Sequence, residues 1–283
     1  MRYPVIILVI AFALGFSTIS AQQLHHEKPS DTATTWQLLR YDAKTTFKGV
    51  IHSFTRPAHW KKKDFKTLGT LLLGSVALTA IDNEANTFFA RQESSVPEVI
   101  KDFGWYFGSP QNYFAATAGI YGFGLFTKNE KVRKTGVLII ASSFTSGLLQ
   151  SIGKNTVGRA RPSANIGPVA FDPFSKASKY HSFPSGHTVL SITMSHAIAK
   201  QFDNTWTKIG IYSLGSIAPI SRLLAGAHWL TDIAFSTALS IIVVDGIDKF
   251  LFNTNAYNYP KKEKKISWDF RFGGNQIGFI GTF

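Results

Sequence analysis

The sequence predicts an all-α protein, a membrane-associated helical bundle of about six core helices. Six apolar stretches follow one another along the chain, and none shows the sustained apolar–polar alternation of a strand. Glycine, alanine, serine and threonine are mixed among the larger residues, which allows helices to approach one another closely. The expected helices are Thr67–Ile81, Tyr113–Thr127, Thr135–Gly153, Thr188–Ala199, Ile209–Ser221 and Trp229–Val244.

The formal net charge of +13 suggests an anionic partner, which could be a membrane surface, a phosphorylated substrate or nucleic acid. Basic residues cluster at Lys61–Lys63, Lys128–Lys134 and Lys261–Lys265, each beside an apolar stretch. Such short runs are typical of cytoplasmic membrane loops, so we expect a membrane and a phosphorylated substrate as partners and no nucleic acid. A soluble protein with a basic surface is the alternative. The sequence sets no oligomeric state.

Residues 1–21 are expected to form a signal peptide or an N-terminal anchor. Arg2 is followed by an apolar run from Val5 to Phe16 and then by small residues. Either interpretation places the protein in the bacterial cell envelope. Cytoplasmic basic loops would put residues 82–112, 154–187 and 222–228 on the periplasmic side. A cleaved signal would invert this topology, so a bundle that lies on the membrane without six spans stays an alternative.

The 283 residues are divided into four segments. Residues 22–59 form a linker and an amphipathic helix, because Phe47, Val50 and Phe54 recur at helical spacing before a break at Pro57. Residues 60–250 contain the six apolar stretches and form the main domain. Residues 251–283 are a C-terminal tail, in which aromatic and charged residues alternate from residue 268 to 272 and predict a short β-hairpin around residues 273–275.

Three clusters of polar residues lie at the margins of apolar helices. Lys154, Arg161 and Arg222 are cations in such positions, where burial requires a resident or visiting anion. Arginine binds phosphate oxygens with a fork of donors, and lysine supplies a point charge. Ser185 and Gly186 directly precede an apolar helix, and a helix N-terminus with a hydroxyl and free N–H groups binds anions.

His228 and Asp232 are four residues apart, which on a helix would let the carboxylate fix the imidazole tautomer. A neutral, oriented imidazole beside a cationic site is a nucleophile suited to phosphorus. His187, at the start of another helix, is expected to protonate the leaving oxygen. A structural His–Asp pair and a zinc site are the alternatives. The three nearby cations disfavour zinc, and we expect neither a metal ion nor a cofactor.

These clusters resemble the three signature motifs of the type-2 phosphatidic acid phosphatase (PAP2) superfamily. The resemblance covers about residues 60–250 and includes eleven fixed positions: Lys154, Arg161, Pro162, Pro184, Ser185, Gly186, His187, Ser221, Arg222, His228 and Asp232. It implies an all-helical core in which these residues converge on one phosphate pocket. It also implies that His228 is the nucleophile, that Asp232 orients it and that His187 is the general acid. The phosphate-binding residues it implies are Lys154, Arg161, Ser185, Gly186 and Arg222.

Residues 157–162 and 182–184 are similar to the lipid-acting branch of this superfamily. The resemblance therefore implies metal-independent hydrolysis of a lipid phosphate monoester or diphosphate through a phosphohistidine. A soluble periplasmic acid phosphatase of broad specificity and a non-enzymatic protein that binds phosphate or membrane are the alternatives. A vanadium haloperoxidase is ranked last, because chains of that branch are longer.

Overall fold

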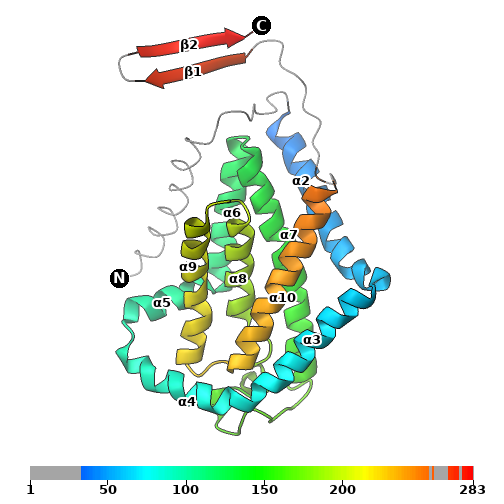
Figure 1. Ribbon diagram of the computed structural model, residues 1–283, viewed down its shortest axis with the longest axis vertical. Helices are drawn as coiled ribbons and strands as arrows, with labels where there is room; N and C mark the ends of the chain where they lie inside the picture. Colours follow the sequence, from blue (N-terminus) through cyan, green and yellow to red (C-terminus); the bar gives the residue numbers. More distant parts are fainter. Residues whose placement is uncertain (1–32, 255–256, 258–266, 274–275, 283) are drawn as a thin grey trace.

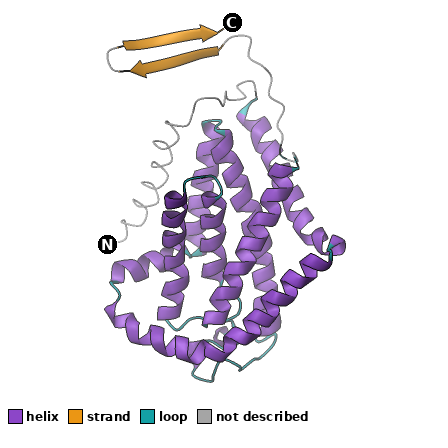
Figure 2. Ribbon diagram, in the orientation of Figure 1, coloured by secondary structure: helices purple, strands orange, loops and turns teal. Residues whose placement is uncertain are grey.

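The computed structural model describes residues 33–254, 257, 267–273 and 276–282 of the chain. The signal peptide or anchor predicted at residues 1–21 and the basic run Lys261–Lys265 lie outside the described residues. The α-helices of the described part are α2 (Thr35–Thr55), α3 (Lys62–Leu78), α4 (Asp82–Gln92), α5 (Glu98–Phe107), α6 (Pro110–Phe126), α7 (Glu130–Val157), α8 (Gly186–Ala199), α9 (Thr205–Leu224) and α10 (Leu230–Asp248). Each of the six apolar stretches lies mainly in one of α3 and α6–α10, which confirms the predicted helical bundle (Figure 2).

The bundle is organised around α8, whose residues from Thr188 to Ala199 are all buried. α7, α9 and α10 pack on α8, while α6 and α2 pack on α7. The core side chains include Leu138 and Ile139 of α7, Ile198 of α8 and Val244 of α10. In Figure 1, the C-terminal ends of α7 and α9 and the N-terminal ends of α8 and α10 lie at one end of the bundle. The termini of these four helices therefore lie at the same end of the bundle.

The end of α7 is fixed by a glycine. Gly158 has a φ of 60°, in the left-handed region that favours glycine, and its N–H donates to the carbonyl of Lys154. A Cβ at this position would lie 1.9 Å from the carbonyl oxygen of Asp172. The chain therefore leaves the helix at a defined point, one residue before Arg159.

Residues 82–112 connect the first two apolar stretches, and none of the six expected helices falls there. They contain α4 and α5, which follow α3 around the outside of the bundle near the end where the four helix termini meet (Figure 1). α5 packs closely on α9, because a Cβ at Gly104 would lie 2.5 Å from the hydroxyl oxygen of Ser221. Both helices are short and of mixed polarity, so a search for long apolar stretches overlooks them.

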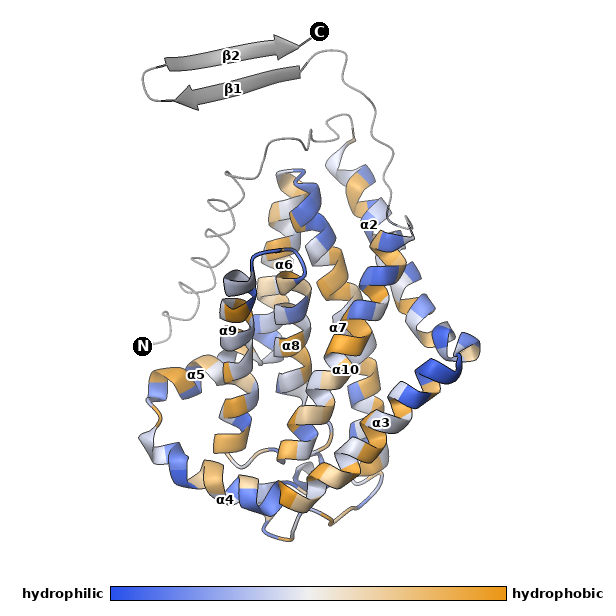
Figure 3. Cartoon of the chain, in the orientation of Figure 1, coloured by the Kyte–Doolittle hydropathy of each residue, from blue (hydrophilic) through white to orange (hydrophobic). Residues whose placement is uncertain are grey.

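Three segments of the described chain are long and apolar enough to cross a membrane: Lys62–Ser95, Glu130–Val157 and Leu230–Asn253. Large apolar side chains on α3 are exposed, among them Leu73 and Val76. Figure 3 colours the later part of this helix largely as hydrophobic. α6 and α8 have 17 and 14 residues, fewer than the roughly 20 that a span requires. The protein is a membrane-associated helical bundle, and three helical segments of its described part, compared with the six spans expected, are both long and apolar enough to cross a membrane.

The segments that flank the six-helix core also have the expected secondary structure. The amphipathic helix predicted around residues 43–54 is part of α2, which ends at Thr55 before a short 3₁₀ turn at Arg56–His59. The predicted C-terminal hairpin is present as β1 (Ser267–Gly273) and β2 (Gln276–Thr282), which pair antiparallel with Ser267 opposite Thr282.

Candidate active site

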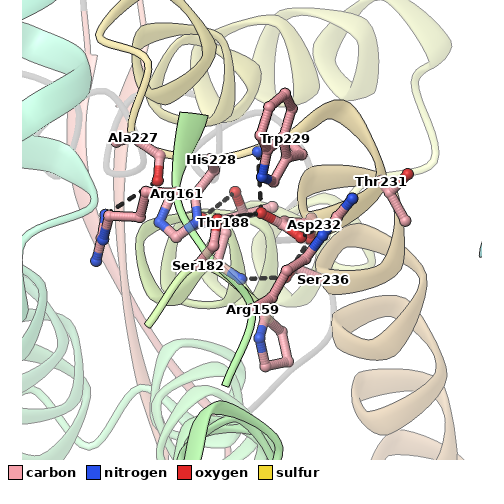
Figure 4. A network of polar contacts seen from close by, with 12 residues as sticks. Arg159, Arg161, Ser182, Thr188, Ala227, His228, Trp229, Thr231, Asp232 and Ser236 are labelled. Carbon is pink, nitrogen blue, oxygen red and sulfur yellow. Dashed lines mark hydrogen bonds and ion pairs between the residues drawn. The ribbon is translucent and has the colours of Figure 1, made fainter. Parts of the chain in front are cut away.

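The predicted site residues come together where the four helix termini meet. Lys154 lies in the last turn of α7, and Arg161 follows in the loop after it. Arg222 lies in the last turn of α9, His228 in the next loop, and Asp232 in the first turn of α10. The remaining three, Ser185, Gly186 and His187, form the N-terminus of α8. All eight residues therefore lie at the end of the bundle where these helix termini are found (Figure 1), and Figure 4 labels Arg161, His228 and Asp232 among them.

His187 is within electrostatic reach of the other charged groups of the site. The pKa of its imidazole is lowered to about 4, chiefly by burial and also by four neighbouring groups: Arg222, His228, Lys154 and Arg161. In the described part of the chain, the Nε2 atom of His187 is buried and has no hydrogen-bond partner. An anion bound among these cations would favour the protonated form of His187.

Backbone carbonyl groups orient the guanidinium of Arg161. Its Nη1 donates to the carbonyl of Ala227 at 3.0 Å, and its Nε donates to the carbonyl of Ser178 at 3.1 Å (Figure 4). The loop that carries Arg161 is itself paired, because its N–H donates to the carbonyl of Lys179 at 2.8 Å. The fork is thus held in one orientation while N–H groups remain for an anion.

Arg222 lies beneath an aromatic side chain of α5. Its guanidinium carbon is 4.4 Å from the ring centroid of Trp105, and its Nε donates to Ser221 Oγ at 3.2 Å. The same indole lies 5.1 Å, centroid to centroid, from the ring of His187. The structure thus places Trp105 against two of the predicted site residues.

The N-terminus of α8 has the features of an anion site. The hydroxyl of Ser185 accepts from the Thr188 N–H at 3.5 Å and from the Thr188 hydroxyl at 3.0 Å, so Ser185 is the N-cap. The N–H groups of Gly186 and His187 lie in the first helical turn, which has no intrahelical acceptors for them. A Cβ at Gly186 would only touch Gln150 at 3.5 Å, so packing within the protein does not require glycine there.

His228 is not on a helix, contrary to the assumption behind its pairing with Asp232. α10 begins at Leu230, and His228 lies in the preceding loop. The distance between His228 Nδ1 and Asp232 Oδ2 is 3.7 Å, which is an ion-pair contact and longer than a hydrogen bond. His228 is 4% exposed, and burial lowers the pKa of its imidazole although the carboxylate opposes this.

Asp232 is fully buried and has three hydrogen-bond donors (Figure 4). Its Oδ2 accepts from Ser182 Oγ at 2.5 Å and from the Trp229 N–H at 2.9 Å, and its Oδ1 accepts from Arg159 Nη1 at 2.7 Å. Sequence reasoning missed the roles of Ser182 and Arg159. Both lie within residues 157–162 and 182–184, which resemble the lipid-acting branch. Their common partner Asp232 is 50 residues from Ser182 and 73 residues from Arg159 in the chain.

This end of the bundle also has an apolar cleft beside the predicted site residues. Among the described residues, no three His, Asp or Glu side chains are grouped so that they could hold a metal ion. An apolar cleft of about 320 Å³ lies between α4, α5 and α9. Its lining includes Phe88, Ile100, Ile217 and Ser221, and Ser221 is adjacent to Arg222 in the chain.

Comparison with known proteins gave matches in both sequence and structure. Residues 135–254 match the model of the PAP2 superfamily, a range that contains all eight predicted site residues. A lipid A 1-phosphatase of Rhizobium etli is 30% identical over 100 residues, which is 35% of this chain and 42% of that protein. A lipid A 1-phosphatase of Porphyromonas gingivalis is 24% identical over 156 residues, or 53% and 32% of the two chains. The alignments thus span less than half the length of these relatives.

The crystal structure of a transmembrane PAP2-type phosphatidylglycerolphosphate phosphatase from Bacillus subtilis superimposes with a TM-score of 0.51. Its sequence is 20% identical, and the superposition covers 67% of this chain and 98% of that one. The two proteins therefore have the same fold.

Proposed function

We propose that the chain, whose residues 135–254 match the model of the PAP2 superfamily, hydrolyses a lipid phosphate monoester or diphosphate through a phosphohistidine intermediate. One observation carries this proposal. Three cations and two histidines in different surroundings lie at one end of a membrane-associated bundle, around a helix N-terminus. His228 faces a carboxylate, whereas His187 faces cations and an indole.

In the first step, the Nε2 of His228 attacks phosphorus, because its Nδ1 faces Asp232. The bond from phosphorus to the lipid oxygen breaks, and its electrons stay on that oxygen. His187 donates a proton to this oxygen, and the dephosphorylated lipid leaves. In the second step, water attacks the phosphohistidine, the P–N bond breaks, and His187 accepts a proton from the water. Inorganic phosphate then leaves.

The cationic side chains supply the charge that phosphoryl transfer requires. Lys154, Arg161 and Arg222 neutralise the phosphoryl oxygens, and the N–H groups of the first turn of α8 donate to them. We therefore expect turnover in the presence of EDTA. A requirement for an added divalent metal ion would contradict this mechanism.

A lipid substrate is favoured over a soluble one by the surroundings of the site. The apolar cleft between α4, α5 and α9 could hold a hydrocarbon chain while the phosphate reaches Arg222. Three segments long and apolar enough to cross a membrane also argue against a soluble periplasmic acid phosphatase. Recovery of the activity in a periplasmic fraction without detergent would favour the soluble alternative.

The decisive experiment is a panel assay with purified, detergent-solubilised protein in EDTA. Phosphate release is measured from phosphatidic acid, phosphatidylglycerol phosphate, a polyprenyl diphosphate and lipid A. His228→Ala should abolish turnover and the trapping of a labelled phosphoenzyme. His196→Gln is the matched control, because His196 pairs with Tyr212 and Asp245 near the opposite end of α8 and α10. Phosphate binding without turnover in the wild-type protein would support the non-enzymatic alternative.

A site that faces the periplasm can be tested with cysteine labelling, since the sequence has no cysteine. Lys176 is exposed in the loop between α7 and α8, and Thr127 is exposed at the opposite end of the bundle. A maleimide that reaches the periplasm of intact cells but does not cross the inner membrane should label Lys176→Cys and leave Thr127→Cys unlabelled. The reverse pattern would place the site in the cytoplasm.

A further inference from the structure

We propose that Asp82 is a positioning residue for the nucleophilic imidazole, and that it acts through Arg159 and Asp232 without touching the substrate. This inference rests on the proposed function. Asp82 begins α4 and lies outside the range that matches the PAP2 model. In the sequence it directly follows an apolar stretch, where a lone carboxylate resembles an ordinary helix-boundary residue.

The observation behind the proposal is a buried arginine between two carboxylates. Arg159 is 2% exposed and donates from Nη2 to Asp82 Oδ2 at 2.6 Å and from Nη1 to Asp232 Oδ1 at 2.7 Å. Its Nε donates to the carbonyl of Pro168 at 2.8 Å. Each nitrogen of the guanidinium thus has an acceptor inside the protein. Arg159 is therefore distinct from the cations that we assign to phosphate binding.

The second carboxylate changes the net charge of this buried group. Arg159 paired with Asp232 alone would be neutral, whereas the group with Asp82 has a formal charge of −1. Attack on phosphorus places positive charge on the imidazole of His228, whose Nδ1 lies 3.7 Å from Asp232. Buried negative charge stabilises that positive charge. Asp82 thus compensates the positive charge of Arg159, which would otherwise cancel the negative charge of Asp232.

Asp82 also holds the chain segment that carries the histidine. Its Oδ1 accepts from the Thr231 N–H at 3.0 Å, and its Oδ2 accepts from the Thr231 hydroxyl at 2.9 Å. Asp232 accepts from the N–H of Trp229. The two carboxylates together bind the backbone on both sides of Leu230, immediately after His228. Position and charge of the imidazole therefore depend on one residue about 150 positions earlier.

The first test is Asp82→Asn, which keeps an acceptor oxygen and removes the charge. We expect kcat to fall about 10- to 100-fold, while KM changes less than about threefold, because the interaction is made with the imidazole and not with the lipid. Asp102→Asn, an exposed substitution on α5, is the matched control and should leave both parameters unchanged. An unchanged kcat in folded Asp82→Asn would overturn the proposal.

A double-mutant cycle separates this role from a general structural one. If Asp82 acts through Asp232, then Asp82→Asn should lower kcat less than about threefold in an Asp232→Asn background. Two effects that multiply would refute the coupling. If Asp82→Asn does not fold, Asp82→Glu and Asp82→Gln give the same comparison at equal side-chain length. The charged variant should then retain the higher kcat, and equal values would refute the role of charge.

A measurement without turnover keeps the inference separate from the proposed function. Nitrogen-15 NMR of the histidines can follow the titration of His228 in the wild type and in Asp82→Asn. The titratable and charged groups nearest this imidazole are Asp232 of α10, Lys154 of α7, Arg161 of the following loop and His187 of α8, and none of them is changed. Loss of the Asp82 charge should move the titration to lower pH. An unchanged titration would overturn the inference, whereas absence of phosphatase activity in the wild type would overturn only the proposed function.

Discussion

Replacement of Asp232 by asparagine removes one charge and leaves the shape of the side chain unchanged. In the native structure, one carboxylate oxygen accepts from Arg159 while the other accepts from Ser182 and from the Trp229 N–H. An amide has only one acceptor oxygen. In either orientation, its NH₂ group faces a donor that previously had an acceptor, and a buried unsatisfied donor costs about 1–3 kcal/mol of stability.

The effect on catalysis can be worked out from the distance to the nucleophile. His228 Nδ1 lies 3.7 Å from Asp232 Oδ2, and two unit charges at such a separation interact by about 4 kcal/mol at an effective dielectric constant of about 20. Loss of this interaction as positive charge develops on the imidazole corresponds to about a thousandfold lower kcat. An Asp→Asn change in the Ser-His-Asp triad costs about 10⁴-fold, which is of similar size.

The assay is the release of inorganic phosphate from the best lipid of the panel, in detergent and EDTA. Asp245→Asn is the matched control, because Asp245 is a half-exposed carboxylate near the far end of the same helix and pairs with Lys200 and His196. It should leave kcat within about twofold of the wild type. If Asp232→Asn is folded and retains more than about a tenth of the wild-type kcat, the orienting role of the carboxylate is refuted.

Three further predictions concern Arg161, Trp105 and His187. Arg161→Lys should lower kcat/KM about 10- to 100-fold, because the donors of an ammonium all lie on one nitrogen and cannot replace the fork that binds two carbonyl groups and the phosphate. Equal activity of the variant and the wild type would show that the fork is not used. Trp105→Leu should raise KM about 2- to 30-fold through loss of the cation–π contact with Arg222, and steady-state kinetics that show a change in kcat alone would contradict this. The general acid must be protonated, and the pKa of His187 is lowered to about 4, so kcat/KM should fall as pH rises above that value. A bound phosphate raises this pKa, so kcat should begin to fall at a higher pH than kcat/KM does. If both parameters fell over the same pH range, His187 would be excluded as the acid.

The helical core could be predicted from sequence because each core helix is a continuous apolar stretch. α8 is the clearest case, since all of its residues from Thr188 to Ala199 are buried and need no polar face. α5 was missed for the opposite reason. It is ten residues long, and its fit depends on Gly104 approaching Ser221, a contact with a helix more than 100 residues later in the chain.

The candidate site was predictable where a residue type alone carries the chemistry. Cations at the margins of apolar helices predicted an anion site, and the structure brings Lys154 and Arg222 to the same end of the bundle. The spacing of His228 and Asp232 led to the wrong local structure. An aspartate in the first turn of a helix can accept from the backbone of the N-cap residue, as Asp232 does from Trp229. A separation of four residues therefore does not require a helix across both.

The position of Arg159 explains how a cationic pocket and a carboxylate can occupy adjacent space. Asp82 and Asp232 are both buried, and both accept hydrogen bonds from Arg159 and from backbone N–H groups at the start of α10. Among the residues that the structure describes, no carboxylate lies within 4.0 Å of the charged nitrogens of Lys154, Arg161 or Arg222.

This separation has a chemical consequence. If either aspartate paired with a phosphate-binding cation, the pocket would lose positive charge and the imidazole would lose its carboxylate at once. Arg159 prevents both losses because its fork is hydrogen-bonded to both carboxylates. Arg159→Lys, with one point charge for two carboxylates, should therefore weaken substrate binding and kcat together, whereas Asp82→Asn should affect mainly kcat. Equal KM values in the two variants would refute this separation of charges.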